Sequence, residues 1–313
     1  MSAIETRGLT REFGKLTAVD DLDLSVEEGA LFGFIGPNGA GKTTTLRLLA
    51  GLLEPTAGEV TVVGIPVGKD PRAVHRLIGY MPDFFGVYED MQVWEYLDFF
   101  ARCYDIPAAR RRQVVVELLD LVDLAEKRDG FVQTLSRGMR QRLCLAHALV
   151  HDPQILLLDE PASGLDPRAR VEMRELLKEL QAMGKTLIVS SHILSELEEI
   201  CDRVGIIEQG KLLFSGAVED VYRQVGQERV LRIRIISDRE EALAALQDYP
   251  GVGEVGEVVE ANGQLEVEFS GDDWALAGLH AHLVNSGVAL THFSGAVGDL
   301  EEVFLQVTKG EVA

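Results

Sequence analysis

A glycine-rich segment between residues 36 and 43 has the residue types and spacing of a phosphate-binding loop. It reads Gly36-Pro37-Asn38-Gly39-Ala40-Gly41-Lys42-Thr43 and fits the P-loop pattern G-x-x-x-x-G-K-[ST]. Glycines let the backbone turn tightly and approach an anion, so that N–H groups and the N-terminus of a following helix point at a phosphate. Lys42 can then reach the β- and γ-phosphates, and the Thr43 hydroxyl can ligate Mg²⁺. The segment therefore predicts a site for a nucleotide and its metal ion.

The flanking residues predict the elements that must position this loop. An apolar, strand-like run, Ala30–Ile35, precedes it, and a helix-like run that begins at Thr44 follows it. A strand, a loop and a helix in this order form the arrangement that the P-loop requires. The predicted nucleotide contacts are Gly36, Pro37, Asn38, Gly39, Ala40, Gly41, Lys42, Thr43 and Thr44.

Two consecutive carboxylates end a second apolar strand, Ile155-Leu156-Leu157-Leu158-Asp159-Glu160. A run that is apolar at every position is typical of a parallel-sheet strand that is buried on both faces. Such a strand would place Asp159 at the sheet edge beside the P-loop, where it can hold Mg²⁺ directly or through water. Glu160 can accept a proton from an attacking water or orient that water. Together with the P-loop, these acids predict a Walker B strand and nucleotide hydrolysis.

The composition limits the possible partners. The chain has 313 residues, 46% of them hydrophobic and 26% charged, and a net charge of −21, which predicts a globular protein of two domains. The negative charge argues against nucleic acid and against charge-driven binding to anionic lipid. No uncharged apolar run approaches the ~20 residues of a membrane span, so we expect a cytoplasmic protein that reaches a membrane only through a partner. Its three cysteines lack C-x-x-C spacing and are expected to be buried thiols.

The pattern of apolar residues divides the chain into three parts. Strand-like and helix-like runs alternate up to about residue 220 and predict an α/β domain. Within it, residues 90–150 read as helices without a strand, which predicts a helical subdomain. Residues 228–313 begin with the alternating strand Arg229–Ile235 and continue as a mixture of strands and helices, ending in a helix-like run, Asp299–Thr308. We therefore expect a small C-terminal α+β domain.

One further motif lies before the Walker B strand and opens a helix. The segment Leu135-Ser136-Arg137-Gly138-Met139-Arg140-Gln141-Arg142 resembles the signature motif of ABC ATPases, whose usual core is L-S-G-G-Q. Ser136 can cap the helix, and Gly138 leaves backbone N–H groups open to an anion. Arg137 and Met139 depart from the usual glycine and glutamine. The order of P-loop, helical insertion, signature and Walker B implies a P-loop NTPase fold of ABC type that binds ATP and Mg²⁺.

The resemblance implies roles for four further places in the chain. Ser163-Gly164-Leu165-Asp166 is similar to the D-loop, which contacts the other subunit in this family. His192 resembles the switch histidine, which contacts the γ-phosphate, and Phe13 resembles the aromatic residue that stacks on adenine. Asp83 stands in a Q-loop-like segment where glutamine is usual. It could still bind Mg²⁺ or a water, but its charge beside the γ-phosphate would be unfavourable without the metal.

Bulky apolar side chains follow Asp83 directly, in Phe84-Phe85-Gly86-Val87-Tyr88. One interpretation is that they cover the helical subdomain. The other is that Phe84, Phe85 and Tyr88 dock a helix of a membrane permease subunit, as in helix-in-groove recognition. The sequence leaves both open.

The resemblance also implies a working assembly. Two copies would face each other head to tail, with ATP between the P-loop of one copy and Ser136 and Gly138 of the other. Lys42, Glu160 and His192 would serve catalysis. The C-terminal part resembles the extension of ATPase subunits of ABC-2-type exporters, which implies a subunit on the inner face of the cell membrane that powers export. The alternative is a soluble ABC ATPase that acts on a macromolecular complex.

Overall fold

A computed structural model of the protein describes residues 2–84, 86, 88, 90–218, 229–257, 264–271 and 273–296. These residues belong to two compact units, one within Met1–Val218 and one within Glu219–Lys309. Phe85 and the helix expected at Asp299–Thr308 lie outside the described residues.

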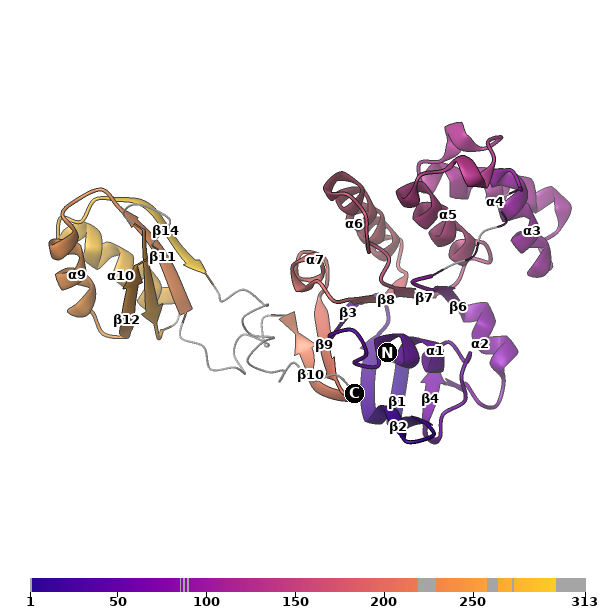
Figure 1. The fold of residues 1–313 in the computed structure, drawn as a ribbon, viewed down its shortest axis with the longest axis horizontal. Coiled ribbons are helices and arrows are strands. Elements are labelled where there is room, and N and C mark those ends of the chain that lie inside the picture. The colour runs from indigo at the N-terminus through magenta and orange to yellow at the C-terminus, as the bar shows by residue number, and fades with distance from the viewer. Residues whose placement is uncertain are drawn as a thin grey trace. The chain divides into compact units, whose positions relative to one another are not determined.

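Two sheets form the centre of the first unit (Figure 1). One is antiparallel, in the order β2-β1-β4-β5, with the strands β1 (Ser2–Phe13), β2 (Leu16–Glu27), β4 (Ala57–Val62) and β5 (Ile65–Pro66). The other has the order β10-β9-β3-β8-β7-β6. Its strands are β10 (Lys211–Ala217), β9 (Arg203–Glu208), β3 (Leu31–Ile35), β8 (Thr186–Ser191), β7 (Ile155–Asp159) and β6 (Ile78–Met81). All neighbours in this second sheet pair in parallel except β10 and β9.

Helix α1 (Lys42–Leu49) joins the two sheets into one core. It packs against β7 of the parallel sheet and against β2 and β4 of the antiparallel sheet. Its buried leucines, Leu46, Leu48 and Leu49, lie in a hydrophobic cluster with side chains from both sheets. The first turn of this helix carries the P-loop lysine, so burial of the leucines fixes where that lysine lies.

The register of the parallel strands brings the chemistry-bearing segments to one edge. Ile35 at the end of β3 pairs with Ser191, and Asp159 at the end of β7 pairs with Ser190. Because parallel strands end on the same side of a sheet, the P-loop, the paired carboxylates and His192 all leave the sheet at this edge. Motifs that are far apart along the chain therefore lie close together in space.

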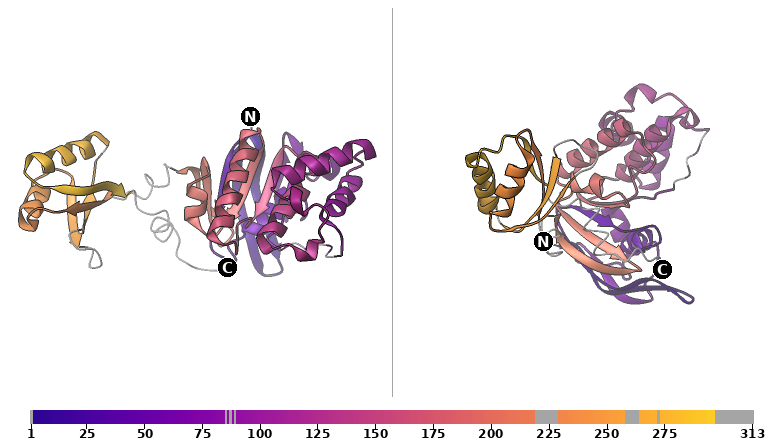
Figure 2. Two further views of the ribbon diagram at one scale, coloured as in Figure 1. Left: turned by 90° about the horizontal axis from the view of Figure 1, so that it is seen from above. Right: turned by 60° about the vertical axis from the view of Figure 1, so that its left-hand side comes forward.

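Helices fill the segment between β6 and β7. They are α3 (Val93–Cys103), α4 (Ala108–Leu121) and α5 (Arg137–Leu149), with the short 3₁₀ turns Ala125–Lys127 and Val132–Thr134. Figure 2 shows these helices, in magenta, gathered to one side of the sheets of this unit. The described part of this unit also contains the helices α2 (Pro71–Leu77), α6 (Pro167–Ala182) and α7 (Leu194–Glu198). Side-chain caps define several helix starts: Ser136 Oγ accepts from Met139 N at 3.3 Å, and Asp166 Oδ1 accepts from Ala169 N at 2.9 Å.

In its described residues, the second unit has one antiparallel sheet and two helices. Its elements are β11 (Arg229–Ile235), α9 (Arg239–Gln247), β12 (Val252–Glu257), β13 (Gln264–Phe269), α10 (Asp273–Asn285) and β14 (Leu290–Ala296), and the strand order is β12-β13-β11-β14. This β-α-β-β-α-β order is the ferredoxin-like arrangement. Leu231, Ile233 and Ile235 of β11 are buried, whereas Arg232 and Arg234 are exposed, as the alternating sequence predicts. The expected fold class, an α/β NTPase with a helical subdomain and a small α+β domain, is confirmed.

Two expectations from composition can be compared with the structure. Cys144 and Cys201 are buried, and burial raises the pKa of the Cys144 thiol to about 12. Cys103 is exposed at the end of α3, so the expectation that all three thiols are buried was wrong. Within the described residues, no helix is both long enough and apolar enough to span a bilayer.

Candidate nucleotide-binding and catalytic site

The P-loop backbone can be made only with glycine at two positions. A Cβ on Gly36 would lie 2.4 Å from Ile207 O, and a Cβ on Gly41 would lie 2.4 Å from Ala18 O. Gly41 also has a φ of 108°, a conformation that side chains disfavour. The residue that follows it begins α1, so free N–H groups of the helix face the loop. This arrangement matches what a phosphate requires.

A cavity of about 420 Å³ opens over the loop. Its lining residues are Phe13, Leu16, Ala18, Pro37, Asn38, Gly39, Gly41, Lys42, Thr43, Thr44, Asp83 and Glu160. The structure thus brings most of the predicted contacts to one cavity. Gly36 and Ala40 are not in the lining: Gly36 packs against Ile207, and Ala40 is buried in the core. Leu16 and Ala18 lie in the lining although the sequence did not single them out, because the β1–β2 hairpin folds over the loop.

Phe13 offers an exposed ring at this cavity. The side chain is 44% exposed, and the guanidinium of Arg11 lies 4.5 Å from the ring centroid. A cation over an aromatic ring stabilises the ring's position. An exposed aromatic group at the mouth of a phosphate-binding cavity is suited to stacking on a nucleobase.

Lys42 is held inside the cavity by carbonyl groups of its own loop. Its Nζ donates to Gly36 O at 2.6 Å and to Pro37 O at 3.2 Å, and it lies 3.5 Å from Glu160 Oε1. Burial lowers the pKa of Lys42, and the nearby Glu160 carboxylate opposes that shift. Phosphate oxygens entering the loop would be stronger partners for the ammonium group than neutral carbonyls.

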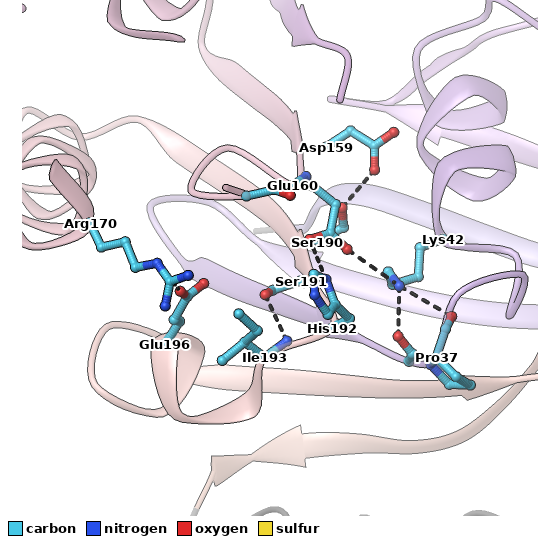
Figure 3. A network of polar contacts seen from close by, with 12 residues as sticks. Pro37, Lys42, Asp159, Glu160, Arg170, Ser190, Ser191, His192, Ile193 and Glu196 are labelled. Carbon is cyan, nitrogen blue, oxygen red and sulfur yellow. Dashed lines mark hydrogen bonds and ion pairs between the residues drawn. The ribbon is translucent and has the colours of Figure 1, made fainter. Parts of the chain in front are cut away.

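Glu160 lies between Lys42 and His192, as Figure 3 shows. Its Oε2 is 2.8 Å from His192 Nδ1, while Oε1 has no hydrogen-bond partner although it is buried. The backbone of Glu160 has a φ of 51°, which is uncommon for a residue with a side chain. This turn takes the chain away from the direction of β7. A carboxylate at the cavity wall whose Oε1 faces the Lys42 ammonium at 3.5 Å without a hydrogen bond can still accept a proton from water.

Asp159 carries a second unsatisfied oxygen. The residue is 1% exposed; its Oδ1 accepts from Ser190 Oγ at 2.7 Å, and its Oδ2 has no hydrogen-bond partner. A buried carboxylate oxygen without a donor fits a cation ligand. Asp159 itself is not in the lining of the P-loop cavity, whereas its neighbour Glu160 and the hydroxyl-bearing Thr43 are. Across the described ranges, no three His, Cys, Asp or Glu side chains group to hold a metal by themselves. The residues therefore fit an Mg²⁺ that takes its other ligands from phosphate and water. Asp83 also lines this cavity.

The signature residues lie at a different cavity. Ser136, Arg137 and Gly138 line one of about 240 Å³ together with D-loop residues. Arg137 Nη2 and Gln141 Nε2 each donate to the carbonyl of Ser163 at 3.0 Å. The arginine that replaces the usual glycine therefore ties the signature to the D-loop of the same chain. Ser136 and Gly138 are absent from the lining of the P-loop cavity.

The apolar residues after Asp83 contact the helical subdomain unequally. Tyr88 is 55% exposed, and its ring centroid lies 5.7 Å from that of Phe99 and 6.4 Å from that of Phe100. Phe84 is 91% exposed. Tyr88 thus partly covers α3, whereas Phe84 presents nearly its whole ring to solvent. We call Phe84, Tyr88 and Phe99 the aromatic surface.

Comparisons with known proteins identify relatives of this chain. Residues 19–163 match the model of the family described as ABC transporter. An uncharacterized ABC transporter ATP-binding protein of Nostoc is 44% identical, and the match covers 66% of this chain and 62% of that relative. The linearmycin resistance ATP-binding protein LnrL of Bacillus subtilis is 30% identical, covering 97% of this chain and 98% of that relative. The Nod factor export ATP-binding protein I of Ralstonia nicotianae is 34% identical, covering 99% and 94%.

Solved structures of ATP-binding cassettes are also similar to this chain, over a length close to that of the first unit. A post-hydrolysis dimer of an ATP-binding cassette with bound ADP and phosphate is similar with a TM-score of 0.63 and 25% identity, over 69% of this chain and 98% of that one. The two matches to LnrL and to the Nod factor export protein extend over almost the whole chain, so they include the second unit.

Proposed function

The chain belongs to the ABC transporter family as an ATP-binding subunit with ATPase activity, and on that basis we propose that it powers a membrane exporter through ATP-driven closure of a head-to-tail dimer. The domains of this proposal are an ABC ATPase domain at residues 1–220, with its helical subdomain at about 90–150, and an accessory domain at 228–313. Two relatives named for linearmycin resistance and for Nod factor export match nearly the full chain, which supports the assignment to export.

The separation of the two cavities is the observation that carries the proposal. Lys42, Thr43 and Glu160 line one cavity, and Ser136 and Gly138 line the other. A single copy thus holds each half of an ATP site in a different place. A second copy turned head to tail supplies the missing half to each P-loop. The similar solved cassette that is dimeric with ADP and phosphate bound supports a dimer.

The residues of the P-loop cavity would act in sequence. ATP phosphates would draw Lys42 Nζ away from the carbonyls of Gly36 and Pro37, while Phe13 stacks on the adenine. Thr43 and Asp159 would hold Mg²⁺, which neutralises charge on the phosphates. Glu160 would take a proton from the attacking water, and His192 would orient Glu160 and contact the γ-phosphate. Asp83 would bind the metal or a water from the Q-loop.

Closure of the dimer follows from contacts that exist only with ATP bound. The γ-phosphate would touch the P-loop of one copy and the signature of its partner, so ATP favours the closed state and hydrolysis removes that preference. The aromatic surface, together with Phe85, would dock a helix of the permease. On this proposal the protein would lie in the cytoplasm, on the inner face of the membrane. The net charge of −21 supports a protein partner and argues against nucleic acid.

Hydrolysis by the purified protein tests the assigned base. Glu160→Gln keeps the size of the side chain and removes its basicity, so turnover should fall by roughly 10²–10⁴-fold while ATP still binds. Glu175→Gln, on an exposed part of α6, is the matched control and should retain activity. Near-normal turnover in Glu160→Gln would overturn the role given to Glu160.

A further inference from the structure

Ser190 is a buried hydroxyl that the motifs do not include. It lies on β8 and pairs across the sheet with Asp159 of β7. It is 0% exposed, so its hydroxyl must find its partners inside the protein. Its two hydrogen-bond partners are the two carboxylate residues of the site, Asp159 and Glu160.

The Ser190 hydroxyl donates one hydrogen bond and accepts another, each with a neighbouring residue. Its Oγ donates to Asp159 Oδ1 at 2.7 Å and accepts from Glu160 N at 3.0 Å. The same Glu160 N–H also lies 3.2 Å from the Ser190 carbonyl, so the whole residue Ser190 holds the turn at Glu160. One serine therefore contacts the candidate metal ligand and the backbone of the candidate base (Figure 3).

We propose that Ser190 is a positioning residue for ATP hydrolysis, which selects the oxygen of Asp159 that faces Mg²⁺ and fixes the turn of Glu160. A hydroxyl hydrogen on Oδ1 leaves Oδ2 as the oxygen without a partner, and that oxygen is the one available to a metal. The bond also fixes the plane of the carboxylate. This inference rests on the proposed Mg²⁺-dependent hydrolysis and adds a residue to it.

The positive φ of Glu160 gives the second part of the proposal its physical reason. A residue with a side chain adopts this conformation only where its surroundings hold it. The bonds from Glu160 N to the Ser190 hydroxyl and carbonyl are such a constraint. Without the hydroxyl, the carbonyl bond remains, so the larger effect of its removal should fall on Asp159 and the metal.

Binding of Mn²⁺ to the full chain tests the proposal without relying on turnover. Electron paramagnetic resonance would measure Mn²⁺ affinity with a non-hydrolysable ATP analogue present. Loss of a residue that orients a metal ligand typically costs 10–100-fold in metal affinity or activity, so we expect Ser190→Ala to weaken Mn²⁺ binding by at least ~10-fold. Binding of the analogue in EDTA should stay at the wild-type level. Ser190→Thr, which keeps the hydroxyl, should restore Mn²⁺ affinity.

Thr186→Val is the matched control. It removes a buried hydroxyl from the other end of β8, where Thr186 Oγ1 accepts from Gly29 N at 2.9 Å. If both variants lose stability but neither loses Mn²⁺ affinity, Ser190 is merely structural and the proposal is overturned. If the wild type with the analogue binds no Mn²⁺, the proposed Mg²⁺ site itself fails. Should Ser190→Ala not fold, Ser190→Cys replaces the donor with a weak one, and undiminished Mn²⁺ affinity there would equally contradict the proposal.

Discussion

The contact between the signature and the D-loop predicts a measurable coupling between two residues. Gly164 has a φ of 67°, and a Cβ on it would lie 2.3 Å from the guanidinium carbon of Arg137. Gly164→Ala should cost about 1–2 kcal/mol for the left-handed backbone. Because the guanidinium is the end of a flexible side chain, it would move and lose its bond to Ser163 O, at about 1 kcal/mol more. The single change should therefore destabilise the first unit by about 2–3 kcal/mol.

Arg137→Ala removes the same hydrogen bond and should cost about 1 kcal/mol. In the double variant that bond can be lost only once, so the total should fall short of the sum by about 1 kcal/mol. Urea unfolding in a Trp274→Phe background would measure this, since Trp274 is 86% exposed in the second unit and Trp94 then reports on the first. Strictly additive free energies of unfolding would refute the idea that Arg137 occupies the space beside Gly164.

Two further predictions concern the aromatic surface and a buried histidine of the first unit. Phe84→Ser with Tyr88→Ser should release the protein from membranes that contain its permease while its own ATPase persists; Leu52→Ser, at another exposed site, is the control, and unchanged sedimentation with membranes would exclude docking through the aromatic surface. Burial lowers the pKa of His147, whose ring stacks on Phe100 at 3.6 Å, to about 4. The stability this histidine contributes is then present above pH ~6.5 and is lost as pH falls toward 4, by about 2 kcal/mol between pH 7 and 5. His147→Leu should reduce the loss of unfolding free energy over that interval by this amount, and an identical pH profile would contradict the assignment.

Local patterns made much of the fold predictable. The P-loop could be recognised because its backbone conformation requires glycine at fixed positions. The spacing of these glycines is visible in the sequence itself. The helical subdomain predicted at residues 90–150 contains α3, α4 and α5, and the predicted apolar strand that begins at Ile155 is β7, which ends at Asp159. Helix α6 was not predicted, although Asp166 followed by Pro167 is a helix-start signal. Its buried side chains, Met173, Leu176, Leu177 and Leu180, also have the i, i+3, i+4, i+7 spacing of an amphipathic helix, so the sequence did carry the signal.

The contacts within the site could not be predicted in the same way. Ser190 meets Asp159 because β7 and β8 pair in one particular register, and no spacing along the chain records that register. Arg137 was noted only as a departure from a motif, whereas its contact with Ser163 depends on how α5 lies beside the D-loop. Cys103 was expected to be buried because cysteines usually are, but it lies at the exposed end of α3.

The mass of Glu160→Gln in solution with ATP and Mg²⁺ is the most direct test of the central claim that two copies complete each ATP site. One copy has a mass of 34.3 kDa, and light scattering should show twice this mass with ATP and the single mass without it. Adding Gly138→Glu places a carboxylate at the signature cavity, where it would repel phosphate, so that variant should bind ATP yet keep the mass of one copy. A single-copy mass for ATP-bound Glu160→Gln, or a dimer that forms equally well with Gly138→Glu, would contradict the account.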